Sequence, residues 1–528
     1  MQKHTIMVCD HIHESGLKML ESQPDINYVN VADLPKDKLL EVIKDADVAI
    51  TRSSTEVNEA FLEAAKKLKA LVRAGVGVDN VDMEGCSKRG IIVMNVPTAN
   101  TIAAVELTMA HMLACMRAFP YAHNDLKLNR IWKREKWLGY ELKDKKLGII
   151  GFGNIGSRVG KRAKAFEMDV VAYDPYINPN KATDLGVEYT DNFDDILSCD
   201  IITIHTPKTD ETIGMIGKDE ITKMKDGVVL INCARGGLYD EAALYEGLKS
   251  GKIRFAGIDV FVKEPATDNP LLDLDNITVT PHLGANTHES QYKIATQAAQ
   301  QALDAARGIS YPNALNLPIR ENEIPEFVKP YLELTQKIGF LAAQANRGAI
   351  RSIRLDAQGE IGDYVDSLAT FATVGALKES LGETINYVNA DFVAKERGIE
   401  IQKSGSPTAG AYKNLIRIRL TTDKEVIEIA GTIFNDDVQR IVEINGFPLD
   451  VEPKGKMILF KNTDVPGVIG DVGRILAEHN VNIADFRLGR DKSGLALAVI
   501  IVDNDVDKDV LRELDSLEAS VYVKYVRL

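Results

Sequence analysis

Short apolar runs, each ending at small or polar residues, recur through the first part of the chain. Unbroken runs of this kind predict parallel strands buried on both faces, because a strand with one wet face alternates apolar and polar residues. The runs span residues 147–150, 170–173, 201–204, 228–231, 255–258 and 277–280. Helical spacing of apolar residues predicts helices at 101–117, 157–166 and 289–306. Strands that alternate with helices indicate an α/β fold.

The pattern changes after about residue 315. Helical spacing at 326–347 and 365–380, with two-residue alternation inside 415–433, predicts a separate α+β unit. The last stretch predicts strands and helices in the order βαββαβ, at 456–461, 467–479, 482–490, 494–502, 506–516 and 519–526. That order is typical of a ferredoxin-like fold.

A glycine-rich turn, GFGNIG at 151–156, follows the apolar run 147–150 and precedes the helix 157–166. Its glycines would permit a tight turn, a close approach of the backbone to a pyrophosphate, and close packing of helix on strand. The helix N-terminus would then face the anion. Asp174 follows the next apolar run, where an acid accepts hydrogen bonds from a ribose. A carboxylate there would repel a 2′-phosphate, so the pattern favours NAD over NADP.

Small and polar residues follow the later strands at their carboxyl ends. They are Thr206, Pro207, Cys233, Ala234, Arg235, Asp259, Pro281 and His282. Ligands of open α/β sheets bind outside the carboxyl ends of the strands, so we expect these residues to line one crevice.

Three ionisable residues suit the oxidation of a 2-hydroxy acid. Arg235 offers a planar fork that can bind a carboxylate and polarise a carbonyl. His282 can exchange the hydroxyl proton near neutral pH. Glu264 beside that imidazole would fix its tautomer and favour its protonated form. Taken singly, these residues are more often a surface cation, a structural histidine and a solvated loop acid, but together at strand ends they predict a catalytic trio.

The N-terminal segment carries the features that would select the substrate. Arg52 and Arg73 stand at the ends of two strand-like runs, and the turn at 75–77 exposes backbone amides. Asn100 opens the helix 101–117, whose N-terminus favours negative charge. So much positive potential suits a phosphorylated hydroxy acid better than glycerate.

Four motifs in order resemble the D-isomer-specific 2-hydroxyacid dehydrogenases. They are GFGNIG at 151–156 with Asp174, NCARGG at 232–237, GIDVF at 257–261 leading to Glu264, and PHLG at 281–284. The resemblance covers the chain up to about residue 315. It implies that Arg235, Glu264 and His282 are the catalytic residues.

The N-terminal segments resemble the phosphoglycerate dehydrogenase branch of that family. This resemblance implies NAD-dependent oxidation of D-3-phosphoglycerate to 3-phosphooxypyruvate, the first step of the phosphorylated L-serine pathway. In that branch an arginine matching Arg52 holds the phosphate, and one matching Arg134 reaches the site of a neighbouring subunit. Roles for both as plain surface charges remain open. The resemblance also implies a homo-oligomer, with a tetramer expected.

The motifs and the resemblance together define the expected ligand contacts. The expected cofactor contacts are Val76, Gly151, Gly153, Asn154, Ile155, Gly156, Asp174, Thr206, Pro207, Cys233, Ala234, Arg235, Asp259, His282, Gly284 and Ala285. The expected substrate contacts are Arg52, Ser53, Arg73, Gly75, Val76, Gly77, Asn100, Arg134, Arg235 and His282. Val76 departs from relatives that carry a hydroxyl residue there. No metal site is expected.

The tail resembles the ACT domain, an amino-acid-binding regulatory unit. In serine-sensitive relatives the positions matching Asn462, Asp464 and Asn482 contact serine, which implies an allosteric site for L-serine here. A role for these residues as turn and capping residues only remains open. The preceding unit resembles an allosteric-substrate-binding, intervening domain. Its arginines Arg351, Arg354, Arg417 and Arg419 could line an anion site, although their alternation is more typical of the wet face of a sheet.

The expected fold is therefore a Rossmann dinucleotide-binding domain inserted in a flavodoxin-like substrate domain, followed by an α+β domain and a ferredoxin-like domain. The N-terminal domain would comprise 1–98 and 285–314, because the helix 289–306 returns the chain to it. The nucleotide domain would comprise 99–284, the middle domain 315–452 and the tail domain 454–528. A crevice between the first two domains predicts hinge motion.

Composition narrows the possible partners and compartment. The chain has 528 residues and a net charge of −14, which opposes nucleic-acid binding. No leader-like segment and no apolar run of about 18 residues is apparent, so we expect neither export nor a membrane span. Five cysteines without CxxC spacing suit a reducing cytoplasm.

Two alternatives remain at this stage. One is a dehydrogenase of another acid, such as glycerate, glyoxylate or 2-oxoglutarate. The other is a non-catalytic, NAD-sensing regulatory protein on the same fold, because a fold does not fix a function.

Overall fold

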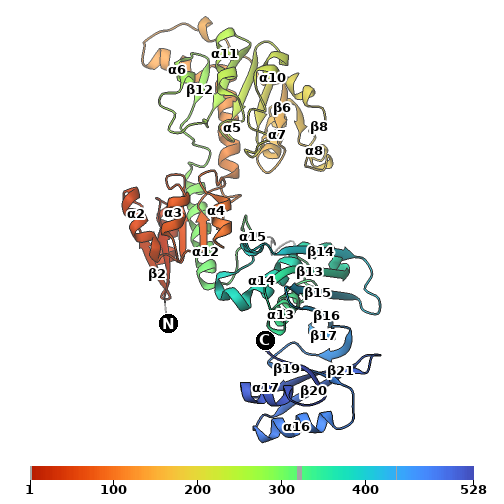
Figure 1. The fold of residues 1–528 in the computed structure, drawn as a ribbon. Coiled ribbons are helices and arrows are strands. Elements are labelled where there is room, and N and C mark those ends of the chain that lie inside the picture. The colour runs from red at the N-terminus through yellow and green to blue at the C-terminus, as the bar shows by residue number, and fades with distance from the viewer. Residues whose placement is uncertain (1–2, 318–323, 436) are drawn as a thin grey trace.

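The computed structural model describes residues 3–317, 324–435 and 437–528. The predicted N-terminal and middle domains also include residues 1–2, 318–323 and 436, which lie outside the described part. Figure 1 shows the nucleotide domain at the top, the N-terminal domain below it, and the middle and tail domains following at the lower right.

The N-terminal domain is built on a parallel sheet of order β2-β1-β3-β4-β5, the flavodoxin-like order. Its elements are β1 His4–Val8, α1 Glu14–Glu21, β2 Ile26–Asn30, α2 Lys36–Val42, β3 Val48–Thr51, α3 Glu59–Ala64, β4 Ala70–Arg73, α4 Met83–Lys88 and β5 Ile92–Met94. Helix α12 (His288–Arg307) returns from the nucleotide domain and packs beside α1. Ile6 and Val8 face α12, whereas Met7 and Cys9 face the core under α2 and α3. Burial on both faces explains the unbroken apolar runs.

The nucleotide domain has a seven-stranded parallel sheet of order β12-β11-β10-β9-β6-β7-β8, which confirms the Rossmann fold. Its strands are β6 Lys146–Ile150, β7 Asp169–Tyr173, β8 Glu188–Thr190, β9 Ile201–Ile204, β10 Val228–Asn232, β11 Ile253–Ile258 and β12 Ile277–Val279. Its helices are α5 Thr101–Arg117, α6 Phe119–Lys127, α7 Gly156–Ala165, α8 Asn180–Thr183, α9 Phe193–Leu197, α10 Lys218–Lys223 and α11 Glu241–Ser250. The pattern did not predict β8, a three-residue edge strand that lacks an apolar run.

The middle domain has a six-stranded sheet of order β14-β13-β15-β16-β17-β18, with two long helices packed on one face. Its elements are α13 Lys329–Ala345, β13 Ile350–Gly359, α14 Val365–Leu381, α15 Ala390–Glu396, β14 Glu400–Ser406, β15 Asn414–Thr422, β16 Val426–Phe434, β17 Val438–Ile444 and β18 Phe447–Val451. Helices α13 and α14 confirm the two predicted helices. Near α15, Asn386 Nδ2 donates to the carbonyl of Gly90 at 2.9 Å, which joins this domain to the N-terminal domain.

The tail domain has an antiparallel sheet of order β20-β21-β19-β22, which confirms the ferredoxin-like fold. Its elements are β19 Lys456–Thr463, α16 Val468–Glu478, β20 Ile483–Arg490, β21 Leu495–Val502, α17 Lys508–Asp515 and β22 Ser520–Arg527. One sheet face packs on its own two helices, through Ile458 and Ile500 for example. The opposite face, which includes Met457 and Leu459, joins the core of the middle domain.

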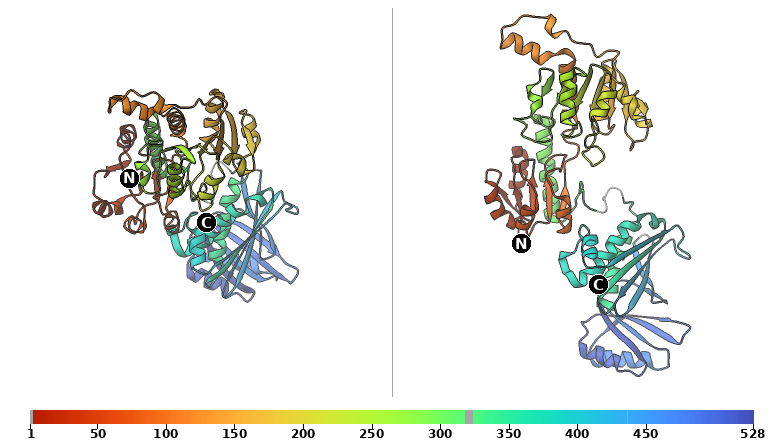
Figure 2. Two further views of the ribbon diagram at one scale, coloured as in Figure 1. Left: turned by 90° about the horizontal axis from the view of Figure 1, so that it is seen from above. Right: turned by 45° about the horizontal axis from the view of Figure 1, so that its top comes forward.

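The middle and tail domains therefore share one hydrophobic core, although the pattern predicts two separate units. Figure 2 shows the two sheets next to each other, at the end of the molecule opposite the nucleotide domain. At this junction, Gln344 exchanges two hydrogen bonds with the backbone of Arg527, at 2.8 and 2.9 Å. Among the described residues no single helix is long and apolar enough to cross a membrane, and only α5 and α6 taken together, bent by 67°, meet that test.

Candidate active site

The glycine-rich turn joins β6 to α7 at the point where the strand order of the nucleotide sheet reverses. Gly151 has φ +84°, and a side chain there would meet the carbonyl of His205. A side chain at Gly156 would collide with the carbonyl of Gly151. At Gly153, by contrast, no described atom lies within 4 Å of where a Cβ would stand. The turn is therefore tight at its ends and open in its middle, which fits a pyrophosphate lying against Gly153.

Asp174 follows β7 and braces this turn. Its Oδ2 accepts from Phe152 N at 2.8 Å, and its Oδ1 accepts from Tyr176 N at 3.0 Å. Each carboxylate oxygen retains a further lone pair, so the residue can still accept a ribose hydroxyl.

Glu264 and His282 form a hydrogen-bonded pair in the crevice. His282 Nδ1 lies 2.8 Å from Glu264 Oε2, and Glu264 Oε1 accepts from Phe261 N at 3.0 Å. Since a carboxylate only accepts, Nδ1 carries the proton and Nε2 is left as a proton acceptor. Burial alone would raise the pKa of Glu264, but the hydrogen bonds from His282 and Phe261 and the charges of His282 and Arg235 outweigh it and lower that pKa. Glu264 is therefore ionised at neutral pH.

The backbone of His282 is held in the left-handed region, at φ +54°. For a residue with a side chain this conformation costs about 1–2 kcal/mol, so the surroundings must hold it. Asp259, which is fully buried, does so: its carbonyl accepts from His282 N at 2.9 Å. Its carboxylate accepts from the next two amides, Leu283 N at 2.7 Å and Gly284 N at 2.9 Å.

Arg235 lies across the crevice between the two domains. Its Nε lies 3.2 Å from Asp79 Oδ2 of the N-terminal domain, and its Nη1 donates to the carbonyl of Ala234 at 2.7 Å. The buried Asn232 shapes this turn, because its amide donates to the carbonyl of Arg235 at 2.9 Å and its Oδ1 accepts from Ala234 N at 3.0 Å. A side chain at Gly77 would collide with the guanidinium, so glycine leaves room for it.

Three arginines of the crevice lie close enough to influence one another. Burial, followed by the charges of Arg235 and Arg52, lowers the pKa of Arg73 to about 10. Burial also lowers the pKa of Arg52. A buried cation whose protonation is disfavoured by two neighbouring positive charges marks a site that attracts an anion.

Buried Asp10, which follows β1, organises the loop that carries Arg52. It accepts from the backbone amide of Arg52 and from Thr55 Oγ1, the latter at 2.8 Å. Asn80 donates to the carbonyls of Arg52 and Thr55, at 2.7 and 2.6 Å. Neither Asp10 nor Asn80 was predicted as a site residue, although Asp10 also lies at the carboxyl end of a strand.

Four polar atoms of the crevice are buried without a hydrogen-bond partner in the part of the chain that the structure describes. They are Arg73 Nε, Asn100 Oδ1, His205 Nδ1 and Thr206 Oγ1. An unsatisfied buried polar group is costly, so their position at strand ends and at the start of α5 fits a site completed by a polar ligand. His205 was not predicted from the sequence.

A cavity of about 740 Å³ opens beside the acid–base pair. The N-terminal domain contributes Lys36, Ser53, Ser54 and Glu56 to its lining, and the nucleotide domain contributes Glu264 and His282 together with apolar residues such as Phe261 and Leu272. The cavity therefore lies between the two domains, next to the predicted proton acceptor.

Two sets of predicted residues lie away from this crevice. Helix α6 lies on the far side of the nucleotide domain from the N-terminal domain (Figure 1). Arg134 follows α6 in the chain and lines a separate cavity of about 630 Å³. In the tail domain Asn462 and Asp464 line a cavity of about 370 Å³, together with Arg490, which forms an ion pair with Asp464 at 3.3 Å. Asn482 is not among the residues that line it, and its amide donates to Asp503 at 2.6 Å.

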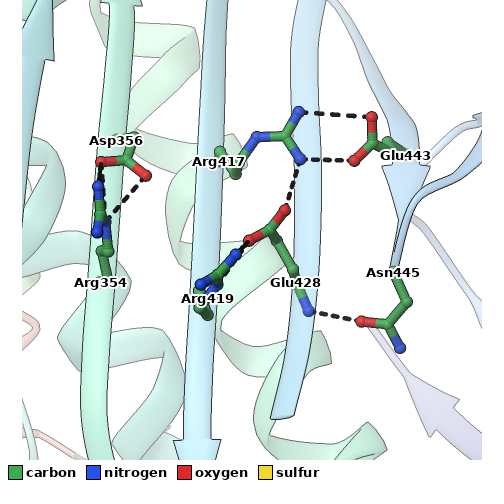
Figure 3. Close-up of polar contacts among 7 residues, drawn as sticks. All are labelled: Arg354, Asp356, Arg417, Arg419, Glu428, Glu443 and Asn445. Atoms are coloured by element: carbon green, nitrogen blue, oxygen red, sulfur yellow. Dashed lines mark hydrogen bonds and ion pairs between the residues drawn. The ribbon is translucent and has the colours of Figure 1, made fainter.

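Three of the four arginines predicted in the middle domain are paired with carboxylates on the open face of its sheet, as Figure 3 shows. The pairs are Arg354 with Asp356, Arg417 with Glu428 and Glu443, and Arg419 with Glu428. Arg354, Arg417 and Arg419 therefore each have a negative partner on the same or a neighbouring strand, whereas no carboxylate partner is described for Arg351, the fourth predicted arginine. This pairing favours the interpretation of a solvated sheet face over that of an anion site.

Three known families match separate parts of the chain. Residues 109–284 match "D-isomer specific 2-hydroxyacid dehydrogenase, NAD binding domain", residues 327–445 match "D-3-phosphoglycerate dehydrogenase intervening domain", and residues 456–519 match "ACT domain". Among solved structures, D-lactate dehydrogenase of Aquifex aeolicus complexed with NAD and lactic acid is 29% identical with a TM-score of 0.53, covering 59% of this chain and 99% of that one.

Relatives of similar length match over nearly the whole chain. A D-3-phosphoglycerate dehydrogenase of Archaeoglobus fulgidus is 40% identical over 94% of both chains. Those of Methanocaldococcus jannaschii and Bacillus subtilis are 41% and 39% identical, over 97% and 99% of both chains respectively. This chain belongs to the D-3-phosphoglycerate dehydrogenase family, within the D-isomer specific 2-hydroxyacid dehydrogenases.

Proposed function

We propose that the protein oxidises D-3-phosphoglycerate to 3-phosphooxypyruvate with NAD, which is the first step of the phosphorylated route to L-serine. The observation that carries the proposal is the Glu264–His282 pair, hydrogen-bonded at 2.8 Å in a crevice that also holds Arg235 and two further arginines. The names of the full-length relatives support the same substrate.

In this mechanism His282 Nε2 accepts the proton of the substrate hydroxyl as the C2–H bond breaks. The glycine-rich turn and Asp174 would hold NAD, which would supply the acceptor for the hydride from C2. Arg235 binds the substrate carboxylate through its planar fork and stabilises the negative charge on the oxygen that becomes the carbonyl. Glu264 stabilises the imidazolium that forms and holds the ring in the required tautomer.

The phosphate would bind to Arg52 and Arg73, at the carboxyl ends of β3 and β4. Ser53 and the backbone at 75–77 add hydrogen-bond donors, and Asn100 stands at the N-terminus of α5, where the helix dipole favours an anion. The cofactor would be held by the glycine-rich turn, by Asp174 and by residues at the later strand ends. The proposed contacts are Val76, Gly151, Gly153, Asn154, Ile155, Gly156, Asp174, Thr206, Pro207, Cys233, Ala234, Arg235, Asp259, His282, Gly284 and Ala285. The proposed domains comprise residues 1–98 with 285–314, 99–284, 315–452 and 454–528.

Formation of NADH tests substrate and cofactor together. The purified protein, given NAD and D-3-phosphoglycerate, should produce NADH much faster than with D-glycerate at equal concentration. Replacing Arg52 by Gln should abolish most of this preference, because the two substrates differ in the phosphate. Equal rates with both acids would reassign the enzyme to another hydroxy acid.

We further propose that the protein assembles as a homo-oligomer, a tetramer, through the arm at 118–141. Large apolar side chains are exposed there, including Trp132 at 76% and Leu138 at 88%. Exposed apolar patches of this kind mark protein interfaces. Arg134 would then reach the crevice of the neighbouring subunit. Light scattering on the purified protein should give a mass above the 58.1 kDa of a single chain. The variant Trp132→Glu should show a lower mass than the wild type.

The tail domain provides for regulation by an amino acid, and we propose L-serine as the ligand. The cavity lined by Asn462, Asp464 and Arg490 holds amide, carboxylate and guanidinium groups, which match the hydroxyl, ammonium and carboxylate of serine. Asn482 would contribute from a second tail domain. Calorimetry should detect L-serine but not D-serine, and Asp464→Asn should remove the binding.

The five cysteines are all buried free thiols, so we propose a reducing compartment, the cytoplasm, as the site of action.

A further inference from the structure

Helix α5 carries a histidine that none of the motifs includes. His111 is 3% exposed, and its ring lies between α5 and the end of β12. Its Nδ1 lies 2.9 Å from Thr278 Oγ1, and its Nε2 lies 2.9 Å from Thr280 Oγ1. Both ring nitrogens are therefore hydrogen-bonded to hydroxyl groups at the start of the loop that carries His282.

The direction of these hydrogen bonds follows from Asp259. The hydroxyl of Thr280 lies 2.6 Å from Asp259 Oδ1, which accepts because the same carboxylate also accepts two backbone amides. Thr280 must then accept from the Nε2–H of His111, and the neutral ring accepts at Nδ1 from Thr278. The contact of Thr278 with the carbonyl of Ala256 is longer, at 3.5 Å, and does not compete.

The chain of donors starts one step further back, at Cys115. Its Sγ lies 3.4 Å from Thr278 Oγ1, whose own proton is already given to His111. The thiol therefore donates to Thr278. Every hydrogen bond in the series from Cys115 to Asp259 then runs in one direction, toward the carboxylate of Asp259. Burial lowers the pKa of His111 to about 4, which keeps the ring neutral and the chain intact at neutral pH.

Asp259 is also the residue that holds His282 in place. Its carbonyl accepts from His282 N, and its carboxylate accepts from Leu283 N and Gly284 N. A carboxylate that has lost the hydrogen bond from Thr280 can rotate, and the two amides would follow it. The left-handed backbone of His282 would then be free to relax.

We propose that His111 is a positioning residue for the reaction: through Thr280 and Asp259 it fixes the backbone that directs His282 at the substrate. This inference rests on the proposed role of His282 as the proton acceptor. In this role His111 contacts neither the substrate nor the cofactor. Replacing His111 should therefore lower kcat more than it changes the binding of either ligand. A small displacement of a reacting group is enough to slow a reaction about tenfold or more.

Four variants test this proposal by steady-state kinetics. His111→Leu and Thr280→Val each interrupt the series of hydrogen bonds and should each lower kcat about tenfold. The KM for D-3-phosphoglycerate and the Kd for NAD should change less than about twofold. In His111→Gln the side-chain amide reaches the position of Nε2 and can still donate to Thr280, so it should restore most of kcat. In His111→Asn the shorter amide reaches only toward Thr278, so it should resemble His111→Leu.

Met112→Leu, the next residue of α5 and also fully buried, is the matched control for changes in helix packing and should keep its kcat. Hydrogen exchange of the peptide that contains Leu283 and Gly284 gives a readout that does not need activity: its protection should fall in His111→Leu and Thr280→Val and be kept in His111→Gln. Equal kcat in the Gln and Asn variants, or unchanged protection in Thr280→Val, would overturn the proposal. An inactive wild-type protein with these same exchange differences would instead count against the proposed reaction alone.

Discussion

Acid should destabilise the nucleotide domain through its buried histidines, and His111 is the one whose share can be isolated by a substitution. Burial lowers its pKa from an ordinary 6.5 to about 4. Between these values the unfolded chain binds a proton at this position and the folded chain does not. The stability that the neutral His111 contributes to the folded state is therefore fully present above pH 6.5. It is lost as the pH falls toward 4.

The size of the loss follows from the two pKa values. Their difference corresponds to about 3 kcal/mol of unfolding free energy once the pH is below both. At pH 4.5 the folded form is already protonated in about a quarter of the molecules, so about 2.5 kcal/mol is expected. The side chain is only 3% exposed, so solvent screens this effect little.

The assay can be confined to the domain concerned. The chain has two tryptophans, Trp132 and Trp137, and both lie on the arm of the nucleotide domain. Trp137 stacks on Tyr121 with ring centroids 5.4 Å apart, and the hydroxyl of Tyr121 donates to the carbonyl of Ile277. Tryptophan fluorescence during urea unfolding therefore reports on this domain.

The comparison is between the wild type and His111→Gln, which keeps a polar side chain but does not titrate. The difference between their free energies of unfolding should change by about 2.5 kcal/mol from pH 7 to pH 4.5, with the wild type losing more. All other titrating groups are common to both proteins and cancel. If the two curves of stability against pH run parallel, the reasoning fails.

Three predictions concern the catalytic trio. His282→Ala should lower kcat about 10²- to 10⁴-fold with little change in the Kd of NAD, and turnover within a few-fold of the wild type would refute its role as proton acceptor. Arg235→Lys keeps the charge but loses the fork, so kcat/KM should fall on the order of 10²-fold, about 2.7 kcal/mol; near-normal efficiency would count against bidentate binding. In Glu264→Gln kcat should fall about tenfold or more, because a neutral amide does not stabilise the imidazolium that forms during the reaction; an unchanged kcat would contradict this.

Local patterns predicted the catalytic half of the molecule well. Unbroken apolar runs were enough to place β6, β7, β9 and β10, because both faces of a parallel sheet are buried. The carboxyl-end rule then placed Arg235, Glu264 and His282 near one another, and the structure does bring Glu264 to His282. Their roles stay predictions.

Other features of the site depend on tertiary packing and left no local signal. A buried histidine on an apolar helix face looks like any core position, so His111 was not recognised until its two hydroxyl partners, more than 160 residues away in the sequence, lay beside it. The pairing of Arg417 with Glu428 and Glu443 likewise depends on strand register, which alternation alone does not specify. The loop at Arg52 depends on Asp10 in the same way.

The core shared by the middle and tail domains bears on how this protein family can recombine. Sequence comparison separates a unit at 327–445 from one at 456–519, which suggests that the second could be exchanged as a cassette. Met457, Leu459, Leu497 and Val499 would, however, face a foreign partner after such an exchange. A chimera that takes residues 454–528 from a relative should therefore unfold at a lower temperature than one that takes 327–528 from the same relative. The middle and tail domains together are therefore the unit that can be exchanged between relatives. A tail domain that evolves to bind a new ligand must keep the sheet face that packs on the middle domain.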